Sequence, residues 1–167
     1  MKEDKPVDRY DPFSHNLVET KGFEELKIGD KFPIPSRTIG DANFAAFQLA
    51  SGDNHPIHYD AEYCKELGYS GMLAHGFQVL IQATPGAGLF PHVLGDCMIG
   101  FIEQSSKFLK PLICGDTVYP MLEIVGLKAQ TKTGVVTVKS TVHNQRNELL
   151  MEGEQKFLVR LDPAKRG

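Results

Sequence analysis

The feature that most constrains the fold is an apolar segment at residues 75–90, which carries almost no charge as far as Leu89. A helix with so few polar side chains has to be buried on most of its sides. Pro85, Gly86 and Gly88 predict that this helix is kinked or ends late, because proline and glycine disfavour a helix interior. Other elements of the chain must therefore cover it.

Four later segments are expected to form that cover. They alternate apolar and polar residues, which is typical of strands with one face covered and one face wet. Residues 144–147 have the composition of a hairpin turn. Residues 30–39 also alternate, but Pro33 and Pro35 limit them to the edge of a sheet. The four predicted strands are 93–109, 117–130, 133–144 and 148–161.

The order of these elements predicts an α+β domain, in which an antiparallel sheet is wrapped around the one long helix. Two shorter helices are expected before it. Apolar residues at helical spacing follow Asp41, a candidate cap, as far as Leu49. Asp60 and Gly68 have the residue types of the start and the stop of the second short helix.

The length of 167 residues fits one domain. We expect that domain at 22–161, between an N-terminal arm at 1–21 and a C-terminal tail at 162–167. The net charge of -3 argues against a nucleic-acid partner, which would need clustered Lys and Arg. We expect a cytoplasmic protein with no membrane contact, because we find neither a secretory signal nor an apolar run of about 18 residues. The three cysteines have no disulfide or metal spacing and are expected to be inert thiols.

The densest group of polar residues is SGDNHPIHYD at 51–60, between the two short predicted helices. Gly52 permits a sharp turn and Pro56 fixes one backbone angle, so this loop is expected to be stiff. It would hold Asp53 and His58 at fixed points. A carboxylate of ordinary pKa ~3.9 and an imidazole of ~6.5 differ in protonation at one pH. Such a pair suits acid/base catalysis at neutral pH.

The loop reads SGDNHPIH at 51–58 and is followed by AHG at 74–76 and FLKPLICGDTV at 108–118. Together these stretches resemble the motifs of the MaoC-like dehydratases and R-specific enoyl-CoA hydratases, over residues 22–161. The resemblance implies a hot-dog fold, in which a curved antiparallel sheet wraps a long central helix. It also implies that two such units pair, with active sites near their interface.

The same resemblance implies a reaction and its residues. The chain is expected to be a hydro-lyase that interconverts a 2-enoyl-CoA and a 3-hydroxyacyl-CoA. Asp53 and His58 match the family's catalytic pair, and Gly76 matches the glycine whose N–H binds the thioester carbonyl oxygen. Ser51 and His55 are further candidates for contact with the substrate. No cofactor is expected beyond the coenzyme A of the substrate, and an acyl-carrier protein fits equally well as the carrier.

His55 departs from the family pattern, which commonly has Asn at this position. Three roles are open to it: it orients a catalytic group, contacts the substrate or only packs. Asp53, His55, His58 and Asp60 are also residue types that bind metals. However, Pro56 restricts the convergence of the two histidines, so no metal site is expected.

Two rival functions fit the same features. A thioesterase can have the same fold, since fold does not fix function, and a non-catalytic acyl-CoA-binding module is favoured by His55 in place of Asn. His75 is expected to brace the start of the apolar helix. Asp60 is expected to cap the short helix at 60–68. A homodimer or higher homo-oligomer is expected, because pairing would cover the open edge of the sheet.

Overall fold

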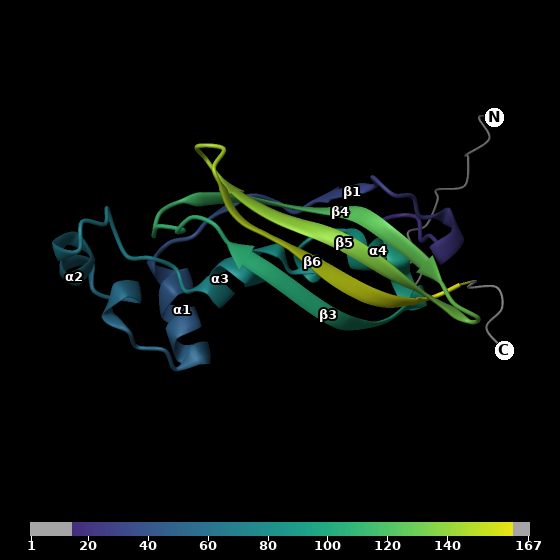
Figure 1. Cartoon of the computed structure of the whole chain (residues 1–167), viewed down its shortest axis with the longest axis horizontal. Coiled ribbons are helices and arrows are strands. Elements are labelled where there is room, and N and C mark those ends of the chain that lie inside the picture. The colour runs from purple at the N-terminus through teal and green to yellow at the C-terminus, as the bar shows by residue number, and fades with distance from the viewer. Residues whose placement is uncertain (1–14, 162–167) are drawn as a thin grey trace, which may run out of the picture.

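The computed structural model describes residues 15–161, whose main element is a curved antiparallel sheet (Figure 1). The strand order is β1-β4-β5-β6-β3, and β2 pairs with the start of β4. The strand β3 therefore lies at one edge of the sheet. The strands are β1 (Lys31–Pro33), β2 (Arg37–Thr38), β3 (Met98–Phe108), β4 (Thr117–Ala129), β5 (Thr133–Asn144) and β6 (Leu149–Arg160).

The alternating pattern predicted β4, β5 and β6 to within one residue at each end. The predicted start of β3 at residue 93 is wrong, because the chain there is still helical. Pro91 lies in the first turn of α4 (Phe90–Leu94), where a missing N–H costs nothing. Gly95 (φ 49°) then ends α4 in a backbone conformation that favours glycine.

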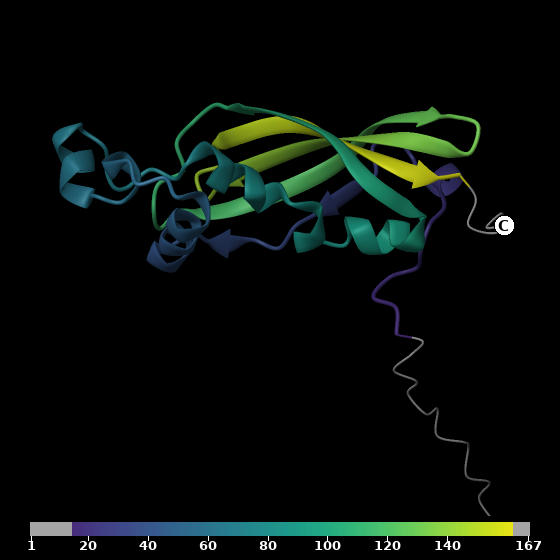
Figure 2. The same ribbon diagram turned by 90° about the horizontal axis from the view of Figure 1, so that it is seen from below.

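Most of the helical pieces before β3 lie on one side of the sheet, whereas α2 projects beyond its end (Figure 2). The helices α1 (Asp41–Ser51) and α2 (Ala61–Glu66) are at one end of the molecule, and α4 is at the other (Figure 1). The predicted cap at Asp41 is wrong by one residue: Gly40 precedes the helix, and its N–H donates to the Asn43 side chain (3.1 Å). Asp60 caps α2 as predicted, since its carboxylate accepts from Tyr63 N–H (3.0 Å).

The single helix expected over 75–90 is replaced by short pieces. These are α3 (Gly76–Leu80), η4 (Ile81–Ala83), η5 (Pro85–Ala87) and then α4. Thr84 is extended (ψ 126°) because a residue before proline avoids the helical region. Gly88 is extended as well, so two breaks interrupt the segment. The segment still lies along the inner face of the sheet, as expected of the central helical element (Figure 2).

The interior between the sheet and this segment contains two separate apolar clusters. The first, centred on Phe90, Phe157 and Ile124, fills the end that carries α4. The second, centred on Phe44, Leu112 and Met151, fills the end that carries α1. Among the described residues, six polar side chains are at most 5% exposed: Gln78, Gln82, Ser140 and Gln155 in the interior, and Asp116 and Asn144 beside the turn between β5 and β6.

The described part of the predicted arm, residues 15–21, makes contact with this interior. Val18 packs against the first cluster, and Lys21 N–H donates to Val93 O (2.7 Å). Residues 1–14 and the predicted tail at 162–167 lie outside the described residues. Cys64 and Cys97 are buried thiols, and Cys114 is a half-buried thiol. Within 15–161 there is no helix of the length and apolarity needed to cross a membrane.

Candidate active site

The loop that follows α1 is held by hydrogen bonds within itself. Gly52 ends α1 in the left-handed region (φ 70°), where glycine is favoured. Pro56 opens a single turn of 3-10 helix, η3 (Pro56–His58), and the ring Nδ1 of His55 accepts from Ile57 N–H at its start (3.2 Å). The predicted stiffness therefore has a structural basis in this capped turn.

Asp53 lies in the tight turn between Gly52 and η3. Its backbone N–H donates to Ser51 Oγ (3.2 Å), and its Oδ1 accepts from His55 N–H (2.9 Å). This backbone N–H lowers the pKa of Asp53 below its usual value; partial burial opposes that effect, and the nearby imidazoles reinforce it. Asp53 is therefore ionised at neutral pH, and its Oδ2 is turned toward two histidines.

His58 is the first of these histidines, and its side chain is only 15% exposed. Its Nδ1 lies 2.7 Å from the carbonyl oxygen of Leu73, so Nδ1 carries a proton and donates it. The neutral ring then has a free lone pair on Nε2, which lies 4.0 Å from Asp53 Oδ2. A water about 2.8 Å from each atom would bridge this gap.

His75 is the second histidine, and its position was only partly predicted. Its Nδ1 accepts from Phe77 N–H (3.0 Å), which confirms that it braces the start of α3. That bond leaves the proton on Nε2, which lies 3.2 Å from Asp53 Oδ2. The contact with Asp53 was missed. One indication of this contact is present in the sequence: His75 directly precedes Gly76, whose N–H is predicted to bind the thioester oxygen.

Gly76 is the first residue of α3, so its N–H has no acceptor within the helix. A surface cavity of about 350 Å³ opens beside it. The helix has only five residues, so its dipole is much weaker than that of a long helix. The Gly76 N–H itself is therefore the group that can bind a negatively charged oxygen. The cavity is lined by Leu73, Ala74, Gly76, Val79 and residues 108–112.

The remaining predicted site residues lie close by. His55 is exposed, and its ring caps η3 while its backbone N–H orients Asp53. Any residue at this position would supply that backbone N–H, so the role of the His55 side chain beyond the cap stays a prediction. Ser51 is exposed and accepts from Asp53 N–H. Contact of either side chain with the substrate stays a prediction.

Asp53, His58 and His75 are also the residues that could hold a metal, because their ligand atoms lie within 4.8 Å of one another. One of these atoms is unsuited to the role. Nδ1 of His75 accepts a backbone N–H, so Nε2 is protonated and has no lone pair for a metal. The four residues considered as ligands from the sequence, Asp53, His55, His58 and Asp60, are not the set that converges, which includes His75. The absence of a metal stays a prediction.

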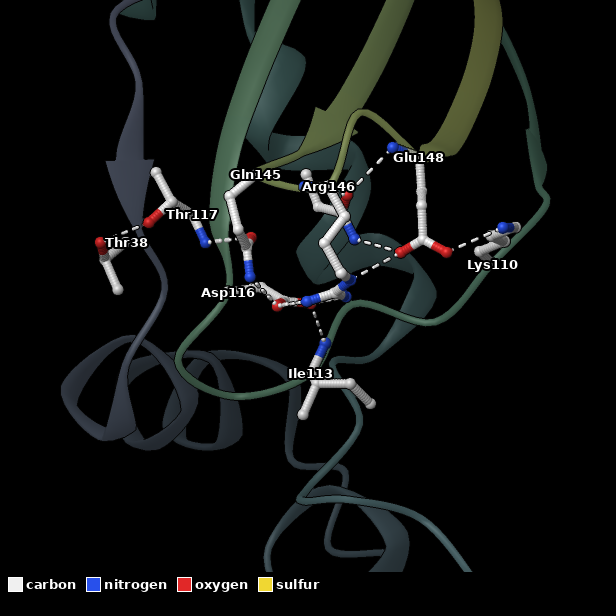
Figure 3. Close-up of polar contacts among 9 residues, drawn as sticks. Thr38, Lys110, Ile113, Asp116, Thr117, Gln145, Arg146 and Glu148 are labelled. Carbon is white, nitrogen blue, oxygen red and sulfur yellow. Dashed lines mark hydrogen bonds and ion pairs between the residues drawn. The ribbon is translucent and has the colours of Figure 1, made fainter.

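A network of charged side chains lies at the turn between β5 and β6 and the start of β4 (Figure 3). The guanidinium of Arg146 donates to both oxygens of Asp116 (3.0 and 3.3 Å), and Gln145 adds a third bond (2.6 Å). Burial acts to raise the pKa of Asp116, but these donors outweigh it and lower that pKa. Glu148 accepts from Arg146 (2.9 Å) and from Lys110 (2.8 Å). We call these five residues the charged brace.

The charged brace contacts the candidate site through the backbone. Asp116 accepts from Ile113 N–H (3.1 Å), which fixes the loop at 112–116 (Figure 3). The same loop bonds to 72–74: Ala74 N–H donates to Leu112 O (2.8 Å), and Cys114 N–H donates to Met72 O (2.9 Å). The residue between them is Leu73, whose carbonyl sets the proton position on His58. The brace therefore holds the strand that orients the imidazole.

Comparisons with known proteins agree with this geometry. The family model described as MaoC like domain matches residues 24–145. An (R)-specific enoyl-CoA hydratase from Rhodospirillum rubrum is 28% identical over 141 residues, which are 82% of this chain and 90% of that protein. The solved structure of a monoamine oxidase regulatory protein from Archaeoglobus has a TM-score of 0.80 at 30% identity and covers 89% of this chain and 100% of that one.

A Mycobacterium tuberculosis protein with a double hot-dog fold superposes with a TM-score of 0.74 at 21% identity. The match covers 89% of this chain and 46% of that one. Identity this low speaks for the fold alone. The predicted hot-dog fold is thereby confirmed, with its central helix in short pieces.

Proposed function

The chain belongs to the family of MaoC-like domains, and on that premise we propose that it catalyses the reversible hydration of a 2-enoyl thioester to a 3-hydroxyacyl thioester. The R. rubrum relative is an (R)-specific enoyl-CoA hydratase, which supports coenzyme A as the carrier. The observation that carries the proposal is the 4.0 Å gap between Asp53 Oδ2 and the unprotonated Nε2 of His58. Both atoms are acceptors, so together they hold the two O–H groups of one water.

In the hydration direction this water is the nucleophile. Its oxygen forms a bond to C3 of the enoyl group while His58 Nε2 takes one of its protons. The electron pair of the double bond moves toward the thioester, and the Gly76 N–H donates to the oxygen that becomes negative. C2 then takes the proton back from the Asp53–His58 pair on the same face. One H and one OH are added, and the pair returns to its starting state.

His75 acts in this scheme as a positioning residue. Its Nε2 lies 3.2 Å from Asp53 Oδ2, the same oxygen that faces His58. The backbone N–H of His55 donates to the other oxygen (2.9 Å). Rotation of the carboxylate would break that hydrogen bond and the contact with the His75 imidazole, so the two contacts together keep the water in one place.

The test is a crotonyl-CoA assay that follows loss of the enoyl thioester absorbance. Asp53→Asn and His58→Ala should each lower kcat at least about 10²-fold, the order expected for removal of an acid/base group. Asp60→Asn is the matched control, because it makes the same change in the same loop and keeps a good helix cap. Near-normal rates in a folded Asp53 or His58 variant would remove the mechanism.

The same samples separate the rival functions. A thioesterase would release free coenzyme A, which a thiol reagent detects. A non-catalytic module would bind the thioester in a titration and leave its absorbance unchanged. The hydratase should instead give a product 18 daltons heavier than the substrate, by addition of water, which mass spectrometry reads directly.

We also propose that the active unit is a homodimer paired through β3. This edge strand and the residues after it carry large apolar side chains that are about half exposed, with Phe101 at 54% and Ile102 at 53%. An uncovered apolar edge strand invites pairing with a second chain. Ile99, Phe108 and Leu109 belong to the same exposed set.

A further inference from the structure

The buried polar residues between the two apolar clusters form an unusual interior for a fold of this size. Gln78 and Gln82 come from the central helical segment, and Ser140 and Gln155 come from the inner face of β5 and β6. The clusters on either side are made of apolar residues. We call these four residues the polar seam.

Part of the polar seam is satisfied within the protein. Gln82 donates to Gln78 O (2.8 Å) and accepts from Arg37 Nε (2.8 Å), while Arg37 Nη2 donates to Gln82 O (2.8 Å). Gln155 donates to Ala83 O (3.1 Å). Gln82 is therefore fixed by bonds on both ends of its amide, and one end of the Gln155 amide is fixed as well.

Four buried atoms of the seam have no partner. These are both the nitrogen and the oxygen of the Gln78 amide, Ser140 Oγ and Gln155 Oε1. Buried polar groups in native proteins are nearly always hydrogen-bonded, because burial without a bond is unfavourable. Gln78 is 1% exposed and lacks a partner for its whole side-chain amide. These four atoms are therefore available to hydrogen-bond a bound group.

The seam lies next to the proposed site. Gln78 is two residues after Gly76 on α3, which places it about 3 Å further along the helix axis. On the sheet, Ser140 pairs with Gly153 and Val138 pairs with Gln155, so Ser140 and Gln155 are diagonal neighbours on one face. Such neighbours are within reach of one bound group.

The chemistry of the four atoms selects the group. Two are carbonyl oxygens that need a donor, one is an amide nitrogen that needs an acceptor, and the hydroxyl can act either way. A hydrocarbon would leave all four unmet, and a carboxylate would leave both carbonyl oxygens unmet. A neutral group that both donates and accepts matches the set better: a hydroxyl meets one carbonyl oxygen and the amide nitrogen, and a primary amide has a donor for each carbonyl oxygen and an acceptor for the nitrogen. We propose that the acyl chain of the substrate carries a hydroxyl or amide substituent that binds in the polar seam; this rests on the proposed function.

The experiment compares 2-hexenoyl-CoA with its 4-, 5- and 6-hydroxy derivatives, its 6-amide and its 6-carboxylate. We expect at least one hydroxylated or amide substrate to exceed 2-hexenoyl-CoA about tenfold in kcat/KM, the order expected when a site built for a hydrogen bond is met. In Gln78→Met this ratio should fall to about one. Gln130→Met makes the same change on an exposed loop residue and should keep the ratio. Equal or higher kcat/KM for the plain or the carboxylate chain would overturn the proposal.

Two further measurements keep the seam testable if no substrate is turned over. Titration of the saturated hexanoyl-CoA and hydroxyhexanoyl-CoA should show about tenfold tighter binding of a hydroxylated chain, lost in Gln78→Met. That result without turnover would refute the hydratase and leave the seam intact, whereas equal binding would refute the seam. Gln78→Met should also raise the melting temperature of the free protein, because it removes two unpaired buried atoms. A fall would mean that Gln78 has a structural partner, which also overturns the proposal.

Discussion

Replacement of His75 separates the two roles that the structure gives this residue. Its Nδ1 caps α3 through Phe77 N–H, and its Nε2–H holds Asp53. His75→Asn keeps a side-chain oxygen suited to capping but is too short to reach Asp53 from the same position. His75→Ala loses both contacts. Both variants also lose ring packing against Phe47, so a comparison between the two isolates the cap.

The size of each effect follows from these contacts. Loss of a good N-cap costs about 0.5–2 kcal/mol, and each kcal/mol shifts the melting temperature of a domain of this size by roughly 2–4 °C. His75→Ala should therefore melt roughly 1–8 °C below His75→Asn. Both should lose activity on the order of 10²-fold, because a carboxylate displaced by about 1 Å no longer holds the water correctly.

Thermal denaturation and the crotonyl-CoA assay measure the two effects on the same samples. Wild-type turnover in His75→Asn would show that Asp53 does not depend on His75. Equal melting temperatures of the two variants would show that the capping bond contributes nothing. Either result refutes the corresponding part of the reasoning, and neither can be produced by a general loss of folding.

Three other predictions concern the charged brace, the dimer and the metal. Lys110, then Asn144 and Arg146, lower the pKa of Glu148 from 4.5 to about 2, so the stability that this carboxylate gives is present above pH 4.5 and is lost as the pH falls toward 2. Glu148→Gln should lower the melting temperature at pH 7 and flatten its dependence on pH across that window; an unchanged profile would contradict the assignment. Ile102→Lys should convert the homodimer to a monomer in light scattering, whereas Lys31→Glu on the opposite edge should not. EDTA should leave the hydration rate unchanged, and a rate restored only by added metal would overturn the proton assignment of His75.

Much of the sheet could be predicted, because one face of each strand is wet and the other is covered. Ser140 and Gln155 fall on the covered face by alternation alone, and the structure confirms this. The pattern could not show that they lack partners, since that depends on which atoms of the helical segment lie opposite.

The central segment at 75–90 was harder to predict, because a run of apolar residues shows that a segment is buried but not whether it forms one continuous helix. An apolar run is equally suited to one helix or to several short turns packed on a sheet. Pro85 and Gly88 indicated a late kink, but the structure has two breaks and a further turn of helix at α4. Gln78 and Gln82 were part of this run, and nothing in their spacing showed that they face inward.

The site was predicted where it is local and missed where it is long-range. Asp53 and His58 are five residues apart in one motif, and the structure brings them within 4.0 Å. His75 is 22 residues beyond Asp53, and its approach depends on the pairing of 72–74 with the loop at 112–116. Local capping by His75 was visible in the sequence, but that pairing was not.

The charged brace has a practical consequence for engineering. Exposed hairpin turns usually accept inserted peptides or tags. The turn between β5 and β6 should not accept an insertion, because its residues Gln145 and Arg146 bind Asp116. Asp116 fixes the loop at 112–116, which pairs with the segment that contacts His58. The turn between β4 and β5, at residues 130–133, lies at the other end of these strands and has no such duty. A fluorescent label or affinity peptide is therefore better placed there.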